Sequence, residues 1–304
     1  MPELPDITVY KERLEALVVG QVLEEVRLRS PFVLRSVVPG PESVHGQALR
    51  AVHRIGKRLA LAFADELGAE RFVVLHLMVA GRLSWFPRER RPGGRIDLVL
   101  FDFEGGTLVL TEAGSKKRAA LHVVEGREAL ADFDRGGLEV HDASPAGFAE
   151  RLRLENRTLK RALTDPRLLS GIGNAYSDEI LHRARLSPAA RTGALSDDEV
   201  ERLRRAILAV LDEWTRRLRR EAGDGWPQKV TAFREGMAVH GRYRKPCPDC
   251  GAPVQRVRYA DNECNYCAVC QCGGKLLADR CLSALLKQDW PKTLAELEER
   301  RRPP

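Results

Sequence analysis

The stretch TLKRALTDPRLLSGIGNAYSDEIL (residues 158–181) decides the architecture that this sequence predicts. Two segments with helical spacing are joined through the turn at residues 171–174, and glycine is common where helices end. On its own, this turn indicates only a break between two helices. In a functional reading, the loop and the following helix N-terminus offer backbone N–H groups to a phosphate. Asn174 would reinforce these donors, and Lys160 could reach the same phosphate backbone.

The chain before this stretch, up to about residue 130, is predicted to be mainly β after one initial helix. Its short apolar or alternating runs include LALAFAD, FVVLHLMVAGRLSWF, IDLVLFDF and TLVLTEA, and turn-rich stretches such as RPGGR and FEGG separate them. Closely spaced strands with little helix between them are typical of a sandwich or barrel and not of a Rossmann sheet.

From about residue 145 to 222 the pattern becomes helical. The segments FAERLRLENRTLKRAL, NAYSDEILHRARL and SDDEVERLRRAILAVLDEWTRRLRR have apolar side chains at helical spacing. The last segment begins with Ser196 as the expected N-cap, and Glu199 follows three residues later, which predicts a capping box. The stretch EAGDGWPQ then has the composition of a linker.

The seven cysteines all lie within residues 247–281. Disulfide frameworks spread their cysteines through the fold, so this crowding indicates a metal site in a reducing compartment. Cys247-x-x-Cys250 and Cys267-x-x-Cys270 form two knuckles that suit one tetrahedral zinc ion. Four thiolates leave no open coordination position, so we expect the zinc to be structural.

Three cysteines are left over, namely Cys264, Cys272 and Cys281. Cys264 together with the second knuckle resembles part of an iron–sulfur run. A ferredoxin-like set would need a fourth cysteine at suitable spacing, usually followed by proline, and would leave the first knuckle unexplained.

The chain begins with MPELPD, where Pro2 and Pro5 suit the first turn of a helix because the missing N–H costs nothing there. By default, Lys57 in RIGKRLAL would be a solvated strand residue. Taken separately, the N-terminal prolines and Lys57 indicate only a helix start and a solvated strand residue.

Four motifs together resemble the formamidopyrimidine-DNA glycosylase/endonuclease VIII family, in their order and in their spacing up to about residue 290. They are PELPD, GKRL, the stretch at residues 158–181, and AVHGRYRKPCPDCG…NYCAVCQ. The resemblance implies an α+β protein: an N-terminal β-sandwich with an N-terminal helix, and a C-terminal helix–two-turn–helix domain with a four-cysteine zinc finger. The implied boundaries are a catalytic domain at 1–135, a helix–two-turn–helix domain at 145–225, a zinc finger at 238–290 and a loose tail at 291–304. Damaged DNA would lie in the cleft between the two domains.

The resemblance also implies a bifunctional DNA glycosylase/AP lyase of base excision repair. After removal of Met1, Pro2 would present a secondary amine with a pKa of roughly 7.7–8, so that a useful fraction is unprotonated near neutrality. This amine would attack C1′ of a flipped nucleotide and expel the base. Glu3 would protonate the sugar ring oxygen. Lys57 completes the catalytic set.

The DNA-binding residues that the resemblance implies include Asp6, where the family has a carboxylate. Lys160, Asn174 and Tyr176 belong to the mid-chain segment. The cofactor would be one structural zinc ion and the partner damaged DNA, in duplex and also in bubble or single-stranded form.

Several positions depart from the family pattern. Asn262 stands where the finger hairpin normally carries an arginine, and Arg256 and Arg258 lie close enough to substitute for it. Val79 stands where 8-oxoguanine-removing members place a wedging methionine. TEAGSKKRAA replaces the usual strand–loop, which leaves a basic set to fill the duplex gap: Lys116, Lys117 and Arg118. We therefore expect weak excision of 8-oxoguanine and a preference for abasic sites, oxidised or ring-opened bases, or bulky, distorting lesions.

Composition and charge limit the classes of protein to which the chain can belong. Net charge is +7, which is compatible with nucleic acid without requiring it. No apolar run approaches the ~20 residues that cross a bilayer, and the charged first twenty residues exclude a secretory signal peptide. We expect a monomer in the cytoplasm, associated with the nucleoid if the source is bacterial. The alternatives are a non-catalytic damaged-DNA binding protein and a zinc-finger transcription factor, but the latter leaves the β domain without a role.

Overall fold

The structure, a computed structural model, describes residues 1–65, 68–88, 93–114, 116–259, 262–278, 283 and 285–300. Its internal contacts divide the chain into two units. The sandwich unit comprises Met1–Arg135 and Glu213–Thr231, and the helical unit comprises Gly136–Asp212 and Ala232–Pro304. The end of the region 145–225, which we expected in the helical domain, therefore clusters with the sandwich.

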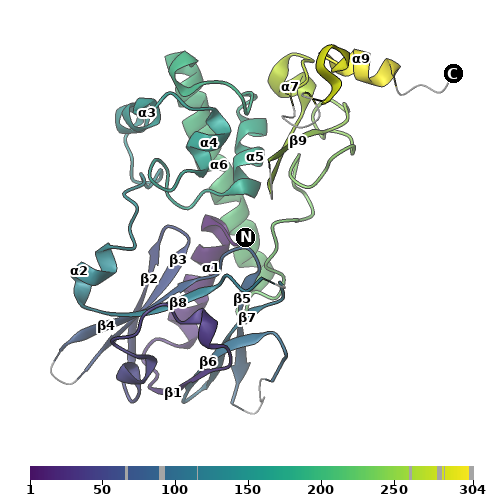
Figure 1. The fold of residues 1–304 in the computed structure, drawn as a ribbon. Coiled ribbons are helices and arrows are strands. Elements are labelled where there is room, and N and C mark those ends of the chain that lie inside the picture. Colours follow the sequence, from purple (N-terminus) through teal and green to yellow (C-terminus); the bar gives the residue numbers. More distant parts are fainter. Residues whose placement is uncertain are drawn as a thin grey trace. The chain divides into compact units, whose positions relative to one another are not determined.

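Two antiparallel four-stranded sheets form the sandwich unit (Figure 1). The first sheet has the order β1-β6-β7-β5, with β1 (Leu23–Leu28), β5 (Gly81–Pro87), β6 (Asp97–Phe103) and β7 (Gly106–Glu112). The second has the order β2-β3-β4-β8, with β2 (Leu49–Ile55), β3 (Arg58–Ala64), β4 (Glu70–His76) and β8 (Ala120–Glu125). Short helical pieces complete the unit: η1 (Pro31–Val33), η2 (Pro41–Val44) and α2 (Gly126–Ala131). The predicted sandwich is confirmed.

Helix α1 (Leu4–Leu17) contributes one apolar face to the sandwich core. Ile7, Tyr10 and Leu14 are at most 1% exposed and pack in the same cluster as side chains from both sheets. Burying a side chain of this size stabilises the fold by roughly 1.5–3 kcal/mol. The helix that carries the N-terminal residues is thereby anchored in the core.

One residue of the predicted linker EAGDGWPQ, Trp226, is part of the sandwich core. Trp226 is 8% exposed, belongs to the core cluster and lies 5.5 Å from Tyr10 between ring centroids. Its indole N–H donates to the carbonyl of Leu83 at 2.8 Å. A turn-rich composition indicated a connection, but the contact with a strand 143 residues away in sequence is a tertiary effect that composition does not report.

The apolar run FVVLHLMVAGRLSWF is split between the two sheets, because a turn separates β4 from β5. Gly81 donates its N–H to the carbonyl of Leu77 at 2.8 Å, and Met78 has φ +50°. A Cβ at Gly81 would lie 2.2 Å from the oxygen of Leu77, so a side chain there would force the turn open. Val79 lies at the centre of this turn.

The helical unit contains α3 (Pro145–Arg153), α4 (Leu159–Thr164), α5 (Asn174–Arg183), η3 (Thr192–Ala194) and the first part of α6 (Asp197–Ala222). Its core is built from leucine and isoleucine side chains of α4, α5 and α6, among them Leu159, Leu163, Ile180 and Leu203, each fully buried. The predicted capping box at the start of α6 is confirmed, since the Ser196 N–H donates to Glu199 at 3.1 Å and the Glu199 N–H donates to Ser196 at 3.2 Å.

The C-terminal part of the same unit holds a two-stranded hairpin, β9 (Gln255–Tyr259) and β10 (Asn262–Tyr266), followed by α7 (Ala268–Cys272). We expected a loose tail at 291–304, whereas η4 (Lys287–Asp289) and α9 (Leu294–Glu299) form within and beside it. Leu294 is 7% exposed and belongs to one cluster with Val257 and Tyr266. Residues 301–304 lie outside the described part of the chain.

Candidate active site

The N-terminal cluster is organised by the start of α1. Glu3 is its N-cap residue and forms a reciprocal capping box with Asp6. The Glu3 N–H donates to Asp6 Oδ2 at 3.0 Å, and the Glu3 side chain accepts from the Asp6 backbone N–H. Both carboxylates are buried, at 1% and 4% exposed. Asp6, which we expected among the DNA-binding residues, therefore positions Glu3 from inside the fold.

The amino terminus lies among charged groups of the sandwich unit. Burial lowers the pKa of the Met1 amino group below its ordinary value of 8.0. The negative charges of Glu3 and Asp6 act in the opposite direction, while the positive charges of Arg82 and Lys57 reinforce the lowering. Pro2 is itself buried. A burial-depressed pKa is the property that a nucleophilic amine requires near neutral pH.

Lys57 belongs to the same group. It occupies the two-residue turn between β2 and β3, next to Gly56 at φ +59°. Burial lowers the pKa of Lys57, the charge of Glu3 opposes this, and Arg58 adds to it. The structure thus brings together the three residues expected to be catalytic, Pro2, Glu3 and Lys57, although they lie up to 55 positions apart in the sequence.

Val79 and the basic loop form a second cluster in the sandwich unit. Val79 is 56% exposed, although it is an apolar residue. Arg82 braces its turn by donating to the carbonyl oxygens of Val79 at 3.2 Å and of Gly81 at 2.6 Å. Sequence reasoning missed Arg82, whose charge also acts on the amino terminus.

The loop that carries Lys116, Lys117 and Arg118 lies beside the turn that carries Val79. The two approach closely at Gly114, where an added Cβ would be 3.4 Å from the Cβ of Ala80. All three basic residues are exposed. Buried Glu112 holds the loop: its carboxylate accepts the N–H groups of Arg118 at 2.8 Å and Ala119 at 3.1 Å, and its carbonyl accepts from Lys117. An exposed apolar tip next to three cations is compatible with entry into a nucleic-acid stack.

In the helical unit, the structure brings Lys160 and Asn174 to the N-terminus of α5. Lys160 Nζ donates to the Asn174 carbonyl at 2.7 Å, and Asn174 Nδ2 donates to the Glu263 carbonyl at 2.9 Å. Tyr176, which we also expected to bind DNA, is only 2% exposed, so its ring packs in the core.

Sequence reasoning missed two buried carboxylates that follow on α5. Asp178 is fully buried and accepts from Lys160 Nζ at 2.6 Å and from His240 Nδ1 at 2.8 Å. Glu179 accepts three backbone N–H groups at 2.7–2.9 Å, those of residues 238, 239 and 240. The signal in the sequence was the polar run SDE (residues 177–179), which stands between Tyr176 and Ile180 in α5.

On the finger hairpin, Asn262 and Arg258 are both exposed. Asn262 pairs with Tyr259, and Arg258 pairs with Glu263 in the strand register. Arg256 instead stacks over the ring of Tyr243 at 4.2 Å and lies 3.4 Å from Glu263. Arg258 is therefore the better placed of the two arginines to act outside the hairpin.

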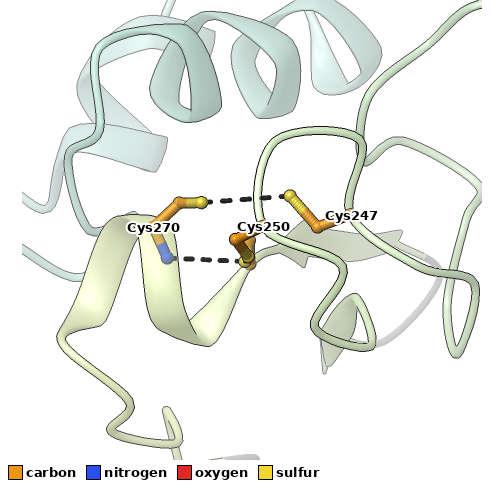
Figure 2. Close-up of side chains that lie close together, drawn as sticks. Cys247, Cys250 and Cys270 are labelled. Atoms are coloured by element: carbon orange, nitrogen blue, oxygen red, sulfur yellow. Dashed lines mark hydrogen bonds between the residues drawn. The ribbon is translucent and has the colours of Figure 1, made fainter.

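The two cysteine knuckles converge as predicted. One ligand atom from each of Cys247, Cys250, Cys267 and Cys270 lies within 4.8 Å of all the others. Figure 2 shows the sulfurs of Cys247 and Cys270 facing each other at 3.9 Å, and those of Cys250 and Cys267 are 3.4 Å apart. Tetrahedral zinc with Zn–S bonds of about 2.3 Å requires S···S distances of roughly 3.8 Å, so the four sulfurs fit this ion.

The spare cysteines lie apart from this quartet. Cys264 is 1% exposed on β10, and Cys272 Sγ donates to Ser187 at 3.5 Å. Cys281 lies outside the described residues. His182, another residue that sequence reasoning missed, places Nε2 3.3 Å from the sulfur of Cys247.

Among the described residues, no helix has the length and apolar character needed to cross a membrane.

Comparison with known proteins identifies the family. Residues 1–119 match the family model of the formamidopyrimidine-DNA glycosylase N-terminal domain, and residues 138–219 match that of the formamidopyrimidine-DNA glycosylase H2TH domain. The chain is 35% identical to a formamidopyrimidine-DNA glycosylase of Thermus thermophilus, over 89% of this chain and 98% of the relative. An uncharacterized formamidopyrimidine-DNA glycosylase-like protein of Mycobacterium tuberculosis is 42% identical over 50% of this chain and 94% of its own length.

Solved structures share the fold. Lactococcus lactis Fpg in complex with abasic-site DNA superposes with a TM-score of 0.76, at 23% identity, over 88% of this chain and 99% of that one. A complex of the same enzyme with DNA containing an oxidized pyrimidine gives a TM-score of 0.75 at 24% identity, covering 89% of this chain and 100% of that one. Both halves of the chain and its full-length relatives lead to one conclusion: the chain belongs to the formamidopyrimidine-DNA glycosylase family.

Proposed function

We propose that this member of a DNA glycosylase family is bifunctional: it removes a damaged base and then cleaves the strand at the resulting abasic site. The observation that carries the proposal is the start of the chain: Pro2 is buried, and next to it burial, Arg82 and Lys57 lower the pKa of the half-buried Met1 amino group, while Glu3 and Asp6 act in the opposite direction. A protein that only binds damaged DNA has no use for an amine poised in this way.

The proposed chemistry begins when removal of Met1 exposes the secondary amine of Pro2. Its lone pair forms a bond to C1′ of the flipped nucleotide, the N-glycosidic bond breaks, and the base leaves with the bonding electrons and a proton. Glu3 donates a proton to the ring oxygen as the sugar opens to an iminium. Loss of a C2′ proton then expels the 3′ phosphate, and a second elimination expels the 5′ phosphate.

Lys57 has two proposed roles in this scheme. Its positive charge lowers the pKa of the amine, and its turn position suits a contact with a DNA phosphate. Asp6 acts indirectly, since it holds the backbone of Glu3 at 3.0 Å.

The proposed DNA-binding set includes groups of both units, most of them exposed. Val79 fills the vacated stack, and Lys116, Lys117 and Arg118 contact the strand opposite or its phosphates. In the helical unit, Asn174 and the backbone of the α5 N-terminus, including that of Tyr176, bind phosphate. Arg258 and Asn262 approach the DNA from the finger hairpin. Lys160 supports this set indirectly, through its contacts with Asn174 and Asp178.

We further propose that Cys247, Cys250, Cys267 and Cys270 hold one zinc ion. The ion would supply structure and no reactive position, because the four thiolates complete its coordination. Their knuckles pack around Val239 and Val254 in a small cluster that has too few apolar side chains to hold the finger by itself.

The proposed lesion preference rests on Val79 and Asn262. Val79 is a smaller wedge than methionine, and Asn262 lacks the charge of an arginine. Both changes cost most where a small lesion lies in a well-stacked duplex, because flipping must then overcome full stacking. We propose weak action on 8-oxoguanine opposite cytosine, and stronger action on abasic sites, oxidised or ring-opened bases, and bulky or distorting lesions.

Single-turnover reactions on a lesion panel, in duplex and in bubble DNA, test the proposal. We expect cleavage at abasic sites that leaves phosphates on both ends of the gap, and slow release of 8-oxoguanine. Tight binding to abasic DNA without any strand cleavage would favour the alternative, a non-catalytic damaged-DNA binding protein. If 8-oxoguanine opposite cytosine were the fastest substrate, the proposed lesion preference would be wrong while the glycosylase proposal would stand.

A further inference from the structure

We propose that Lys160 is a positioning residue that holds the finger hairpin onto α5 through buried Asp178, and that it is not itself a phosphate ligand. This proposal rests on the proposed function, because the hairpin matters only if it contacts DNA. It also replaces the role that the family resemblance implied for this lysine.

The ammonium group of Lys160 has its full complement of acceptors inside the protein. An ammonium has three donors, and Nζ lies 2.7 Å from the Asn174 carbonyl, 2.8 Å from Ser177 Oγ and 2.6 Å from Asp178 Oδ1. The side chain of Lys160 is 12% exposed and that of Asp178 is 0% exposed. A phosphate could bind Lys160 only by displacing one of these three acceptors.

Asp178 transmits this contact to the finger. Its second oxygen, Oδ2, accepts from His240 Nδ1 at 2.8 Å and from the Asn265 backbone N–H at 3.0 Å. Burial raises the pKa of Asp178, but the charges and hydrogen bonds of Lys160 and His240 outweigh it and hold the pKa below its usual value. The carboxylate thus stays ionised in a site where an unpaired charge would be costly.

Asn265 and His240 are the two finger residues that this carboxylate orders. Asn265 is fully buried on β10, and its Oδ1 accepts the Gly241 N–H at 2.7 Å. Asn174 adds a parallel contact from α5 to β10 through the Glu263 carbonyl at 2.9 Å. Asn262 begins β10, and Arg258 pairs with Glu263 across the hairpin. The contacts of Asn174 and Asp178, both of which Lys160 holds, therefore position these exposed residues of the hairpin.

Second-site rescue separates this role from direct phosphate binding. Lys160→Met removes the ammonium group from Asp178 Oδ1 and leaves the buried carboxylate with only His240 and the Asn265 N–H. The double variant Lys160→Met/Asp178→Asn removes both charges and keeps an acceptor for His240 and Asn265. A neighbouring exposed cation on the same helix, Arg161, supplies the matched control Arg161→Met.

The first measurement is hydrogen exchange of the zinc-loaded protein without DNA. We expect the Asn265 amide to exchange at least tenfold faster in Lys160→Met, and to recover most of its protection in the double variant. Arg161→Met should exchange like the wild type. Unchanged exchange in Lys160→Met, or a double variant no better protected than the single one, would overturn the proposal.

The second measurement is the salt dependence of binding to abasic-site duplex DNA. Each phosphate contact contributes about −0.9 to the slope of log K against log salt. Lys160→Met should weaken binding but keep the wild-type slope, and the double variant should regain affinity. A slope that becomes shallower by about one, with no rescue, would make Lys160 a phosphate ligand. If the wild type binds no abasic DNA, the proposed function fails, and hydrogen exchange alone still decides the positioning role.

Discussion

The pKa of the N-terminal amine is the single-residue property that controls formation of the covalent intermediate. Only the unprotonated amine attacks. Burial lowers the pKa of the Met1 amino group, next to buried Pro2, below its ordinary value of 8.0, and we expect the same direction for the Pro2 amine once Met1 is removed. Adduct formation should therefore rise with pH and level off at a pH lower than that of an exposed amine. Lys57→Met removes a charge that lowers this pKa, so the profile should move to higher pH. Trapping rates measured from pH 5 to 9 check this, with Lys11→Met, a partly exposed lysine of α1, as the control.

A shift in the opposite direction, or none, would show that Lys57 does not act on the amine. The control must also leave the profile unchanged, because Lys11 pairs with Glu15 at 2.7 Å on the surface of α1.

Glu3 lies at the same site and should separate the two chemical steps. Glu3→Gln keeps the shape of the buried side chain but removes the proton donor, so release of a damaged base should fall by 10²-fold or more, in line with general acid catalysis. Cleavage at a preformed abasic site should fall much less. Single-turnover rates on the two substrates measure the difference, and an equal loss in both would mean that Glu3 is not the acid for base release.

At the scale of elements, the finger should depend on its four sulfurs and hardly on the spare cysteines. Cys267→Ser should release zinc and loosen the hairpin, because its sulfur also accepts the Cys270 N–H at 3.4 Å. Cys264→Ser should keep one zinc per chain. Metal content by mass spectrometry checks both variants. Zinc loss from Cys264→Ser alone, or a visible iron–sulfur absorption band, would refute the quartet.

Strand β4 carries a pH-dependent contribution to stability through His76. Burial, reinforced by Arg58, Lys57 and His122, lowers the pKa of His76 to about 4 from 6.5. Below pH 6.5 His76 takes up a proton in the unfolded chain, whereas in the folded chain it stays neutral down to about pH 4. The free energy of unfolding should therefore fall from pH 6.5 to about 4 and then level off. Urea unfolding across this range should show a weaker decline in His76→Gln. A decline identical to that of the wild type would assign the effect to other groups.

Elements governed by local spacing could be predicted from the sequence. The strand runs, the capping box of Ser196 and Glu199, and each of the two cysteine knuckles depend on side chains only a few positions apart. Trp226 and Asp178 could not be placed, because their surroundings come from residues far away in the chain: Leu83 in one case, His240 and Asn265 in the other. For the same reason, the resemblance implies DNA-binding roles for Asp6 and Tyr176 without indicating that both side chains are buried.

At the scale of the whole molecule, the proposed activity divides between the two units. The amine, its acid and the wedge belong to the sandwich unit, while the α5 N-terminus and the finger belong to the helical unit. A damaged-DNA binder would need only the groups that hold DNA. The N-terminal amine beside Glu3 and Lys57 is what distinguishes a lyase from such a binder, so the proposed lyase activity depends on the covalent chemistry of the terminus.

Borohydride trapping on abasic-site DNA tests that claim most directly, because it reduces the iminium to a stable protein–DNA bond. The wild type should give an adduct that peptide mapping assigns to Pro2. Pro2→Gly, and a chain that keeps extra residues before Pro2, should give strongly reduced adduct while still binding the DNA. A wild-type chain that yields no adduct, or an undiminished adduct in both altered chains, would contradict the account.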